Sequence, residues 1–379
     1  MSYSKNSLLL RRDDSQALFL NGEYSIMNEK GGTAMAETKM AAKGLVNKPA
    51  EKQSLSAVVA KFRELGLLGF IIVLSLIVQL RNPSFLTLEN MNDMITNTAI
   101  LSILAAGMML VIITRGIDLS IGATLALSGM IAALTVNAFP EVNPLIAIML
   151  GTAVGLVCGV VLGFLIAKMG ILPIIATLGM MNVFRGLTFM ASGGKWVSAH
   201  QMPVSFKAIA TGSIFGINTL IVIAVVIYIV FYYFINHTRT GRQIYAVGSN
   251  PESAKISGIR NDRILWLVYS IMGGLSGLAG VLWVSKFASA QGDTAMGYEL
   301  SVIAACVLGG VSIAGGSGKV SGVILGSILL GILNNALPLI NVSPFWQTGI
   351  QGSIILIAVI TNALVKRGVD RNNLMRRNI

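Results

Sequence analysis

Residues 144–167 read PLIAIMLGTAVGLVCGVVLGFLIA, an uncharged apolar stretch long enough to cross a membrane. Glycines recur in it every four residues, at Gly151, Gly155, Gly159 and Gly163. On a helix with 3.6 residues per turn, these glycines form one smooth ridge. Apolar burial gives helices no advantage over lipid, so a ridge that lets two backbones approach indicates tight helix packing inside a membrane.

The composition of the whole chain also indicates a membrane protein. Its 379 residues are 54% hydrophobic and 12% charged, and the mean hydropathy is +0.75. A water-soluble protein must cover its surface with polar groups, so this balance excludes that class. The same figures exclude disorder for most of the chain.

Outward from that stretch, apolar runs predict an all-α polytopic protein with about ten transmembrane helices. The expected spans are 62–80, 95–114, 117–138, 144–167, 171–190, 214–235, 264–284, 298–314, 319–340 and 345–365. The polar residues 1–61 lack the apolar run of a cleaved signal, and we expect a disordered tail there. Residues 366–379 form a short basic tail.

The distribution of charge predicts the topology. Lys and Arg number 28 against 16 Asp and Glu, a formal net charge of +12. Residues 1–64, 236–263 and 366–379 contribute +3, +3 and +4 of it. The positive-inside rule places all three segments in the cytoplasm, which an even number of spans allows. No basic face interleaved with aromatic residues appears, so nucleic acid is not an expected partner.

Residues 315–319 read GGSGK and resemble a phosphate-binding loop. The motif is incomplete, because Ile313 stands where its first glycine belongs and Val320 replaces the Ser or Thr that would hold magnesium. The stretch therefore predicts a tight turn between two spans, and no nucleotide site.

Residues for metal or acid–base chemistry are scarce. The two histidines, His200 and His237, lie in loops expected on opposite sides of the membrane, which argues against a catalytic pair. Cys158 and Cys306 lie in apolar runs and read as small buried hydrophobes, not as a disulfide or metal ligands. These residues therefore argue against a membrane enzyme.

Ionisable groups near the spans need a reason, because they are costly at membrane depth. We expect Asp118 to cap the helix that follows it, with Arg115 offsetting its charge. Glu299 opens the expected span 298–314, and capping is again favoured. The alternative for all three is a gate or a contact with a partner.

Polar side chains in or beside the spans suggest a path for a polyhydroxylated solute, because amides supply both hydrogen-bond donors and acceptors. Bonding between helices is an equally good role for any single one. The residues are Asn97, Asn182, Arg185, Asn334, Asn335 and Gln347.

The loop 236–263 contains a helix signal. Asn250 suits the N-cap, Pro251 the first turn and Glu252 the positive helix end, and Gly258 suits a stop after about two turns. A lone helix this short is marginal in water, so we expect it to dock into a groove of a partner.

From this loop outward, the sequence resembles the ribose-type branch of carbohydrate ABC importer permeases over about residues 84–365. The matching segments are IDLSIG at 117–122, ATLGM at 176–180, GR at 241–242, GSNP at 248–251, EL at 299–300 and IAACVLGG at 303–310.

Within that branch the sequence is most similar to rhamnose permeases, with autoinducer-2 permeases as near relatives. The similar segments are SGGKWV at 192–197, AHQM at 199–202, LWVS at 282–285, NALP at 335–338 and SPFWQ at 343–347.

The resemblance implies a non-catalytic permease in the bacterial inner membrane, with a second permease subunit, alike or related, completing the path. A cytoplasmic ATPase would hold ATP and magnesium, and an external protein would deliver the sugar. The ATPase would engage a coupling helix at 249–259. The residues expected there are Arg242, Gly248, Asn250, Pro251, Glu252, Ala254, Gly258 and Ile259.

Two other classes stay open. A secondary transporter driven by protons or sodium would need an embedded acid, and Asp118 and Glu299 are the candidates. A passive channel is disfavoured, because the glycine ridge indicates close packing instead of a wide pore.

Overall fold

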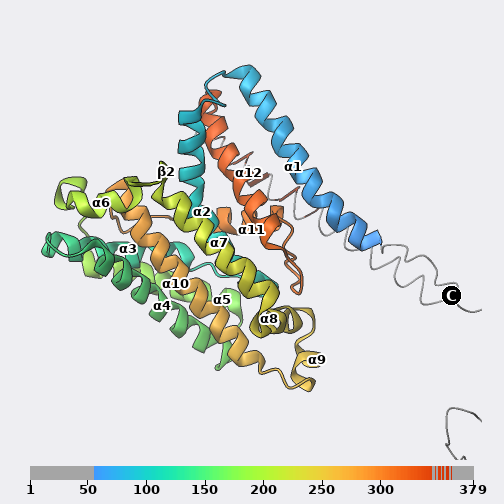
Figure 1. Cartoon of the computed structure of the whole chain (residues 1–379). Helices are drawn as coiled ribbons and strands as arrows, with labels where there is room; N and C mark the ends of the chain where they lie inside the picture. The colour runs from blue at the N-terminus through green and yellow to red at the C-terminus, as the bar shows by residue number, and fades with distance from the viewer. Residues whose placement is uncertain are drawn as a thin grey trace, which may run out of the picture. The chain divides into compact units, whose positions relative to one another are not determined.

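The computed structural model of the protein describes residues 55–343 and the further positions 346, 349, 350, 352, 353, 356, 357 and 360. Most of the expected span 345–365, Gln347, the tail 366–379 and residues 1–54 of the N-terminal tail lie outside the described residues. The described part is mostly helical, with one small hairpin and several irregular connections between the helices (Figure 1).

Eight helices of the described part are long and apolar enough to cross a membrane. They are α1 (Leu55–Arg81), α2 (Leu88–Ile113), α3 (Ile121–Ala138), α4 (Pro144–Ala167), α5 (Pro173–Ser192), α7 (Thr219–His237), α10 (Asn261–Phe287) and α12 (Val320–Leu339). The shorter elements are η1 (Ala199–Gln201), α6 (Val204–Thr211), β1 (Ser213–Ile214), β2 (Ile217–Asn218), α8 (Arg239–Ser249), α9 (Pro251–Ile256) and α11 (Tyr298–Leu308). The strands pair antiparallel, Ser213 with Asn218 and Ile214 with Ile217.

The all-α membrane architecture is confirmed, while the ten-span count and the sidedness stay predictions. The expected span 144–167 coincides with α4. The expected span 298–314 is too long, because α11 ends at Leu308. Its 11 residues cover roughly 16 Å, about half of a hydrocarbon core of about 30 Å. Glycines follow directly, and Gly310 has a φ of +95°, which an α-helix does not allow.

Several helix starts also differ from the expectation; α1 begins at Leu55 instead of 62, and α7 at Thr219 instead of 214 because the hairpin occupies residues 213–218. α2 begins at Leu88 instead of 95, because the Thr87 hydroxyl accepts a hydrogen bond from the Asn90 N–H and caps a polar first turn. α3 begins at Ile121 instead of 117, because residues 114–120 form a turn in which Arg115 has a φ of +67°.

α10 packs against α2, α3, α4 and α6, and its closest contacts are made by glycines. A Cβ atom on Gly155 of α4 would lie 2.5 Å from the Cα of Gly277, and one on Gly273 would lie 2.5 Å from the Cα of Gly159. The glycine ridge of α4 therefore meets a second ridge on α10. α3 approaches α10 in the same way, since a Cβ on Gly129 would lie 2.8 Å from the carbonyl oxygen of Gly280.

Neighbouring glycines of α10 offer a matched test of this packing. Gly273→Ala forces a methyl group into the α4 backbone, whereas a Cβ on Gly274 meets only Leu156, at 3.8 Å. Overpacking of this kind costs about 2 kcal/mol, so we expect the melting temperature in detergent to fall by about 5 °C for Gly273→Ala. Gly274→Ala should melt at the same temperature or higher, because alanine favours the helix. Equal melting of the two variants would contradict the packing described here.

Candidate functional site

The short helix predicted in the loop 236–263 is present as α9. The Asn250 side chain accepts hydrogen bonds from the N–H groups of Glu252 and Ser253, both at 3.0 Å. The helix ends at Ile256, and Gly258 follows with a φ of +80°. The capping roles expected for Asn250 and Gly258 are thus in place.

A second helix, α8, precedes it and was not expected. The Thr238 hydroxyl caps it by accepting from the Gly241 N–H at 3.0 Å. Its buried side is formed by Gly241, Ile244, Val247 and Gly248, and Arg242 is exposed. This spacing of three and four residues is a helix pattern that the sequence already contained. Gly241 and Gly248 lie in this pattern, and glycine is typical of loops, so the stretch 239–249 was not predicted as a helix.

The expectation that Arg115 offsets the charge of Asp118 is wrong, because the Arg115 guanidinium binds the end of α8. Its Nε donates to the carbonyl oxygen of Gly248 at 2.6 Å and its Nη2 to that of Ser249 at 2.5 Å. The last carbonyls of a helix lack intrahelical partners and favour a cation, which explains the contact. Asp118 is 3% exposed and accepts from the Ser120 N–H and hydroxyl, at 2.8 and 2.7 Å.

The glycine-rich turn before α12 completes this contact. The Gly316 N–H donates to the carbonyl oxygen of Ile113, the last residue of α2, at 2.8 Å. Gly315 has a φ of +82°, and a Cβ there would lie 2.9 Å from the carbonyl oxygens of both Ile113 and Gly248. The run that resembles a phosphate loop therefore allows three backbones to meet. We call Ile113, Arg115, Gly248, Ser249, Gly315 and Gly316 the loop junction.

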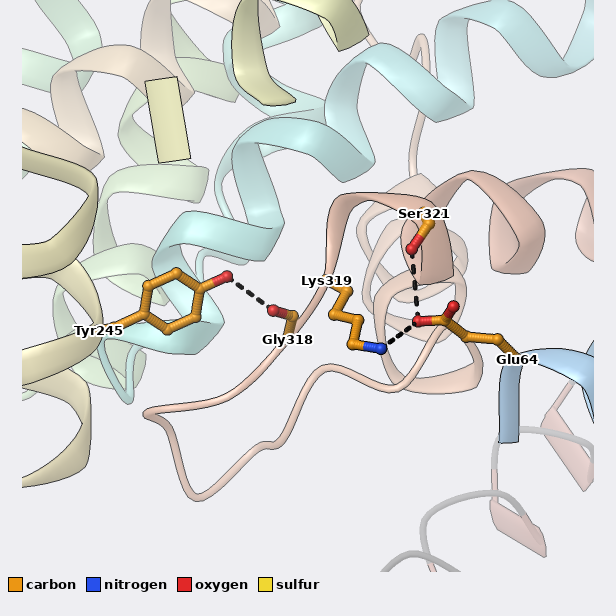
Figure 2. Close-up of polar contacts among 5 residues, drawn as sticks. All are labelled: Glu64, Tyr245, Gly318, Lys319 and Ser321. Atoms are coloured by element: carbon orange, nitrogen blue, oxygen red, sulfur yellow. Dashed lines mark hydrogen bonds and ion pairs between the residues drawn. The ribbon is translucent and has the colours of Figure 1, made fainter. Parts of the chain in front are cut away.

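Figure 2 shows further contacts of the residues that follow Gly316 in this turn. The Tyr245 hydroxyl of α8 donates to the Gly318 carbonyl oxygen at 2.7 Å, and burial raises the pKa of Tyr245, so the donor is kept. Lys319 forms an ion pair of 3.0 Å with Glu64 of α1, which also accepts from Ser321 at 3.3 Å. The turn thus links α8 to α1 and α12.

α9 is fixed on one side and open on the other. Ala254 is 5% exposed, and the Asn261 side-chain amide of α10 donates to the Pro251 carbonyl oxygen at 2.8 Å. Ile256 is 88% exposed, and Glu252 is also exposed. Ile256 is a large exposed apolar side chain next to Lys255, on a helix that packs against α8 and α10. This arrangement suits a docking surface for another protein.

The amides predicted for a solute path have different partners. Asn335 of α12 and Asn90 of α2 exchange two side-chain hydrogen bonds, at 3.0 and 2.9 Å, which joins two helices. Asn182 donates to the carbonyl oxygen of Leu178 in its own helix, at 3.0 Å, and Asn334 is exposed on α12. Gln347 lies outside the described residues.

Arg185 of α5 holds the non-helical segment that precedes α11. Its Nη1 donates to the carbonyl oxygens of Gly292 and Thr294, at 2.9 and 2.7 Å. Glu299 lies in the first turn of α11, but the N-cap is Gly297 and has no side-chain hydrogen bond. The capping expected of Glu299 is therefore wrong, and its carboxylate lies near Gly122 of α3 instead.

Asn97 of α2 accepts a hydrogen bond from Lys286 of α10. Lys286 was not singled out from the sequence, although a lysine at the end of an apolar run is an available signal.

A cavity of about 730 Å³ lies among α1, α2, α7 and α12. Its lining includes Ile71, Met94, Tyr228 and Ile332, and none of its lining residues is a carboxylate or an amide. Hydroxyl groups are the polar side chains of this mainly apolar lining. In the described part of the chain, no group of three or more His, Cys, Asp or Glu could hold a metal ion.

Comparison with known proteins gives consistent matches. The model of the family "branched-chain amino acid transport system / permease component" matches residues 90–359. The ribose import permease proteins of Escherichia coli K12 and Bacillus subtilis 168 are each 40% identical, over 77% and 79% of this chain and 91% and 92% of theirs. The galactose/methyl galactoside import permease protein of Escherichia coli K12 is 33% identical, over 80% of this chain and 94% of its own. No solved structure matches.

The loop junction predicts a measurable change in local stability. Arg115→Ala leaves the last carbonyls of α8 without their cation, so amide hydrogen exchange in residues 244–256 should accelerate about tenfold or more. Arg242→Ala, which removes an exposed arginine of the same helix, is the control and should leave exchange unchanged. Equal exchange in the two variants would mean that Arg115 does not hold α8.

Proposed function

The chain belongs to the family of branched-chain amino acid transport system permease components, and from that membership we propose that it is the membrane subunit of an ABC importer for a monosaccharide. The relatives at 33% to 40% identity are named as ribose and galactose permeases, which supports a sugar as the solute. The subunit is non-catalytic, and ATP hydrolysis belongs to a partner ATPase.

The single observation that supports coupling to an ATPase is that α9 is exposed on one side and packs against α8 and α10 on the other. Its charge environment is basic, and the positive-inside rule then places it in the cytoplasm, where an ATPase is available. Ile256 offers the apolar contact that such a partner needs.

The loop junction explains how a movement of α9 reaches the solute path. α9 follows α8 after Asn250, and Arg115 and Gly316 join the end of α8 to α2 and to the turn before α12. Closure of an ATPase dimer would move α8 and α9 as one body, and α2 and α12 would move with them. A second permease subunit, identical or related, completes the path, and an external binding protein delivers the sugar.

Rhamnose is the solute we propose. The support is the similarity to rhamnose permeases of segments 192–197, 199–202, 282–285, 335–338 and 343–347. An autoinducer-2 or ribose permease is the alternative within the family. A secondary sugar transporter is the alternative outside it.

Uptake by the complete importer in proteoliposomes tests this proposal. With its ATPase, its binding protein and ATP, we expect labelled rhamnose to accumulate faster than ribose, galactose or autoinducer-2. Omission of ATP should abolish uptake. Faster uptake of ribose would replace rhamnose with ribose, and undiminished uptake without the ATPase would refute the ABC importer.

Ile256→Asp should disrupt docking of the ATPase, because it places a charge in a desolvated contact. We expect the affinity of the ATPase for the permease to fall at least about tenfold, measured by titration on permease in nanodiscs. Ile256→Val keeps an apolar side chain and should bind normally. Unchanged affinity of Ile256→Asp would exclude α9 as the docking helix.

A further inference from the structure

The segment 288–297 connects α10 to α11. α11 ends at Leu308, and the next residue, Gly309, packs against Gly322 near the start of α12. α11 covers roughly 16 Å, about half of a hydrocarbon core of about 30 Å, so with its last residue at the membrane surface its first residue would lie inside the core. The segment would then connect the far end of α10 to a helix that starts inside the membrane.

This segment is irregular, yet part of it is exposed. Ala288, Ala295 and Gly297 have positive φ, at 48°, 56° and 80°, and Met296 is 81% exposed. Asp293 is exposed as well. Non-helical backbone at membrane depth is tolerated only where protein buries it or where it lines a water-filled cavity. An exposed carboxylate on this segment favours the water-filled cavity.

Three aromatic side chains gather where this segment begins and ends. Trp283 and Phe287 of α10 have ring centroids 4.8 Å apart, and Trp283 meets Tyr298 of α11 edge to face at 5.1 Å. Trp283 and Tyr298 are half-buried, whereas Phe287 is 51% exposed. The cluster thus has an accessible apolar side.

A lysine and an amide lie beside these rings. The Lys286 ammonium lies 5.5 Å from the centroid of the Phe287 ring and donates to Asn97. Asn97 is exposed and lies roughly 14 Å along α2 from Leu88, the first residue of that helix. Asp93, one turn earlier on α2, is exposed and interacts electrostatically with Lys286.

We propose that Trp283, Phe287 and Tyr298, together with Lys286 and Asn97, bind a monosaccharide on the solute path. The aromatic surfaces suit the apolar C–H face of a sugar ring, and a 6-deoxyhexose adds a methyl group to that face. The ammonium donates to hydroxyl groups, and the amide both donates and accepts. A few polar groups beside an apolar wall is the usual composition of a small-molecule site.

This inference rests on the proposed function, because it names the site that such an importer uses. It also gives Arg185 a positioning role. Through its bonds to Gly292 and Thr294, this side chain holds the segment that brings Tyr298 to Trp283.

Thiol labelling tests whether water reaches the proposed site. Both native cysteines are buried, so a cysteine introduced in the full chain is the reactive one. In membrane vesicles, Asn97→Cys should react with a membrane-impermeant, positively charged thiol reagent. Ile72→Cys, exposed on α1 away from the cluster, is the control and should stay unlabelled because lipid surrounds it. Failure of Asn97→Cys to react would overturn the proposal.

Uptake by the complete importer tests binding. Trp283→Ala should lower the uptake rate about tenfold, the factor that loss of one aromatic contact commonly gives. The ATPase activity stimulated by the binding protein should stay within about twofold, because the loop junction is intact. Trp283→Phe should restore most of the uptake, which separates binding from folding. Trp266→Phe, in the same helix but facing Phe164 of α4, is the control and should import normally.

The outcomes separate the two proposals. If the unmodified importer accumulates no monosaccharide, the proposed function fails. If it imports sugar and Trp283→Ala imports equally well, the site is wrong and the function stands.

Discussion

Direct contact between helix backbones is the constraint on which the rest of the structure depends. Within lipid, apolar side chains gain little by leaving the bilayer for one another, so helices associate through close packing and dispersion. Along α10, glycines remove the side chains that would separate the helix from α3 and α4. Many short contacts then replace the hydrophobic driving force of a soluble core.

The loop junction uses the same device at the end of the bundle. Gly248, Gly315 and Gly316 bring three chain segments within hydrogen-bonding distance, and Arg115 joins them with a charged side chain. Ile113 and Gly248 are buried in the loop junction, whereas Arg115 and Ser249 are exposed. If α9 is the docking helix, a displacement applied there would reach α2 and the turn before α12 through these contacts.

The spans could be predicted from the sequence where a single physical property decides them. α4 is uncharged, apolar and bounded by Asn143 and Lys168, so composition alone places its ends. The Asn250 cap of α9 was also readable, because capping is local. In contrast, the shortness of α11 depends on the turn conformation that follows it. The partners of Arg115 depend on residues more than a hundred positions away. Patterns along the chain contain no information on such contacts.

The small size of α9 has a consequence for how an importer assembles. A helix of six residues buries far less surface than a stable one-to-one complex requires. In an assembly with two permease subunits, two such helices would engage one ATPase dimer, and the second engagement would be intramolecular. Avidity would then supply the affinity that a single helix lacks. Each individual contact would stay weak enough to rearrange within every transport cycle.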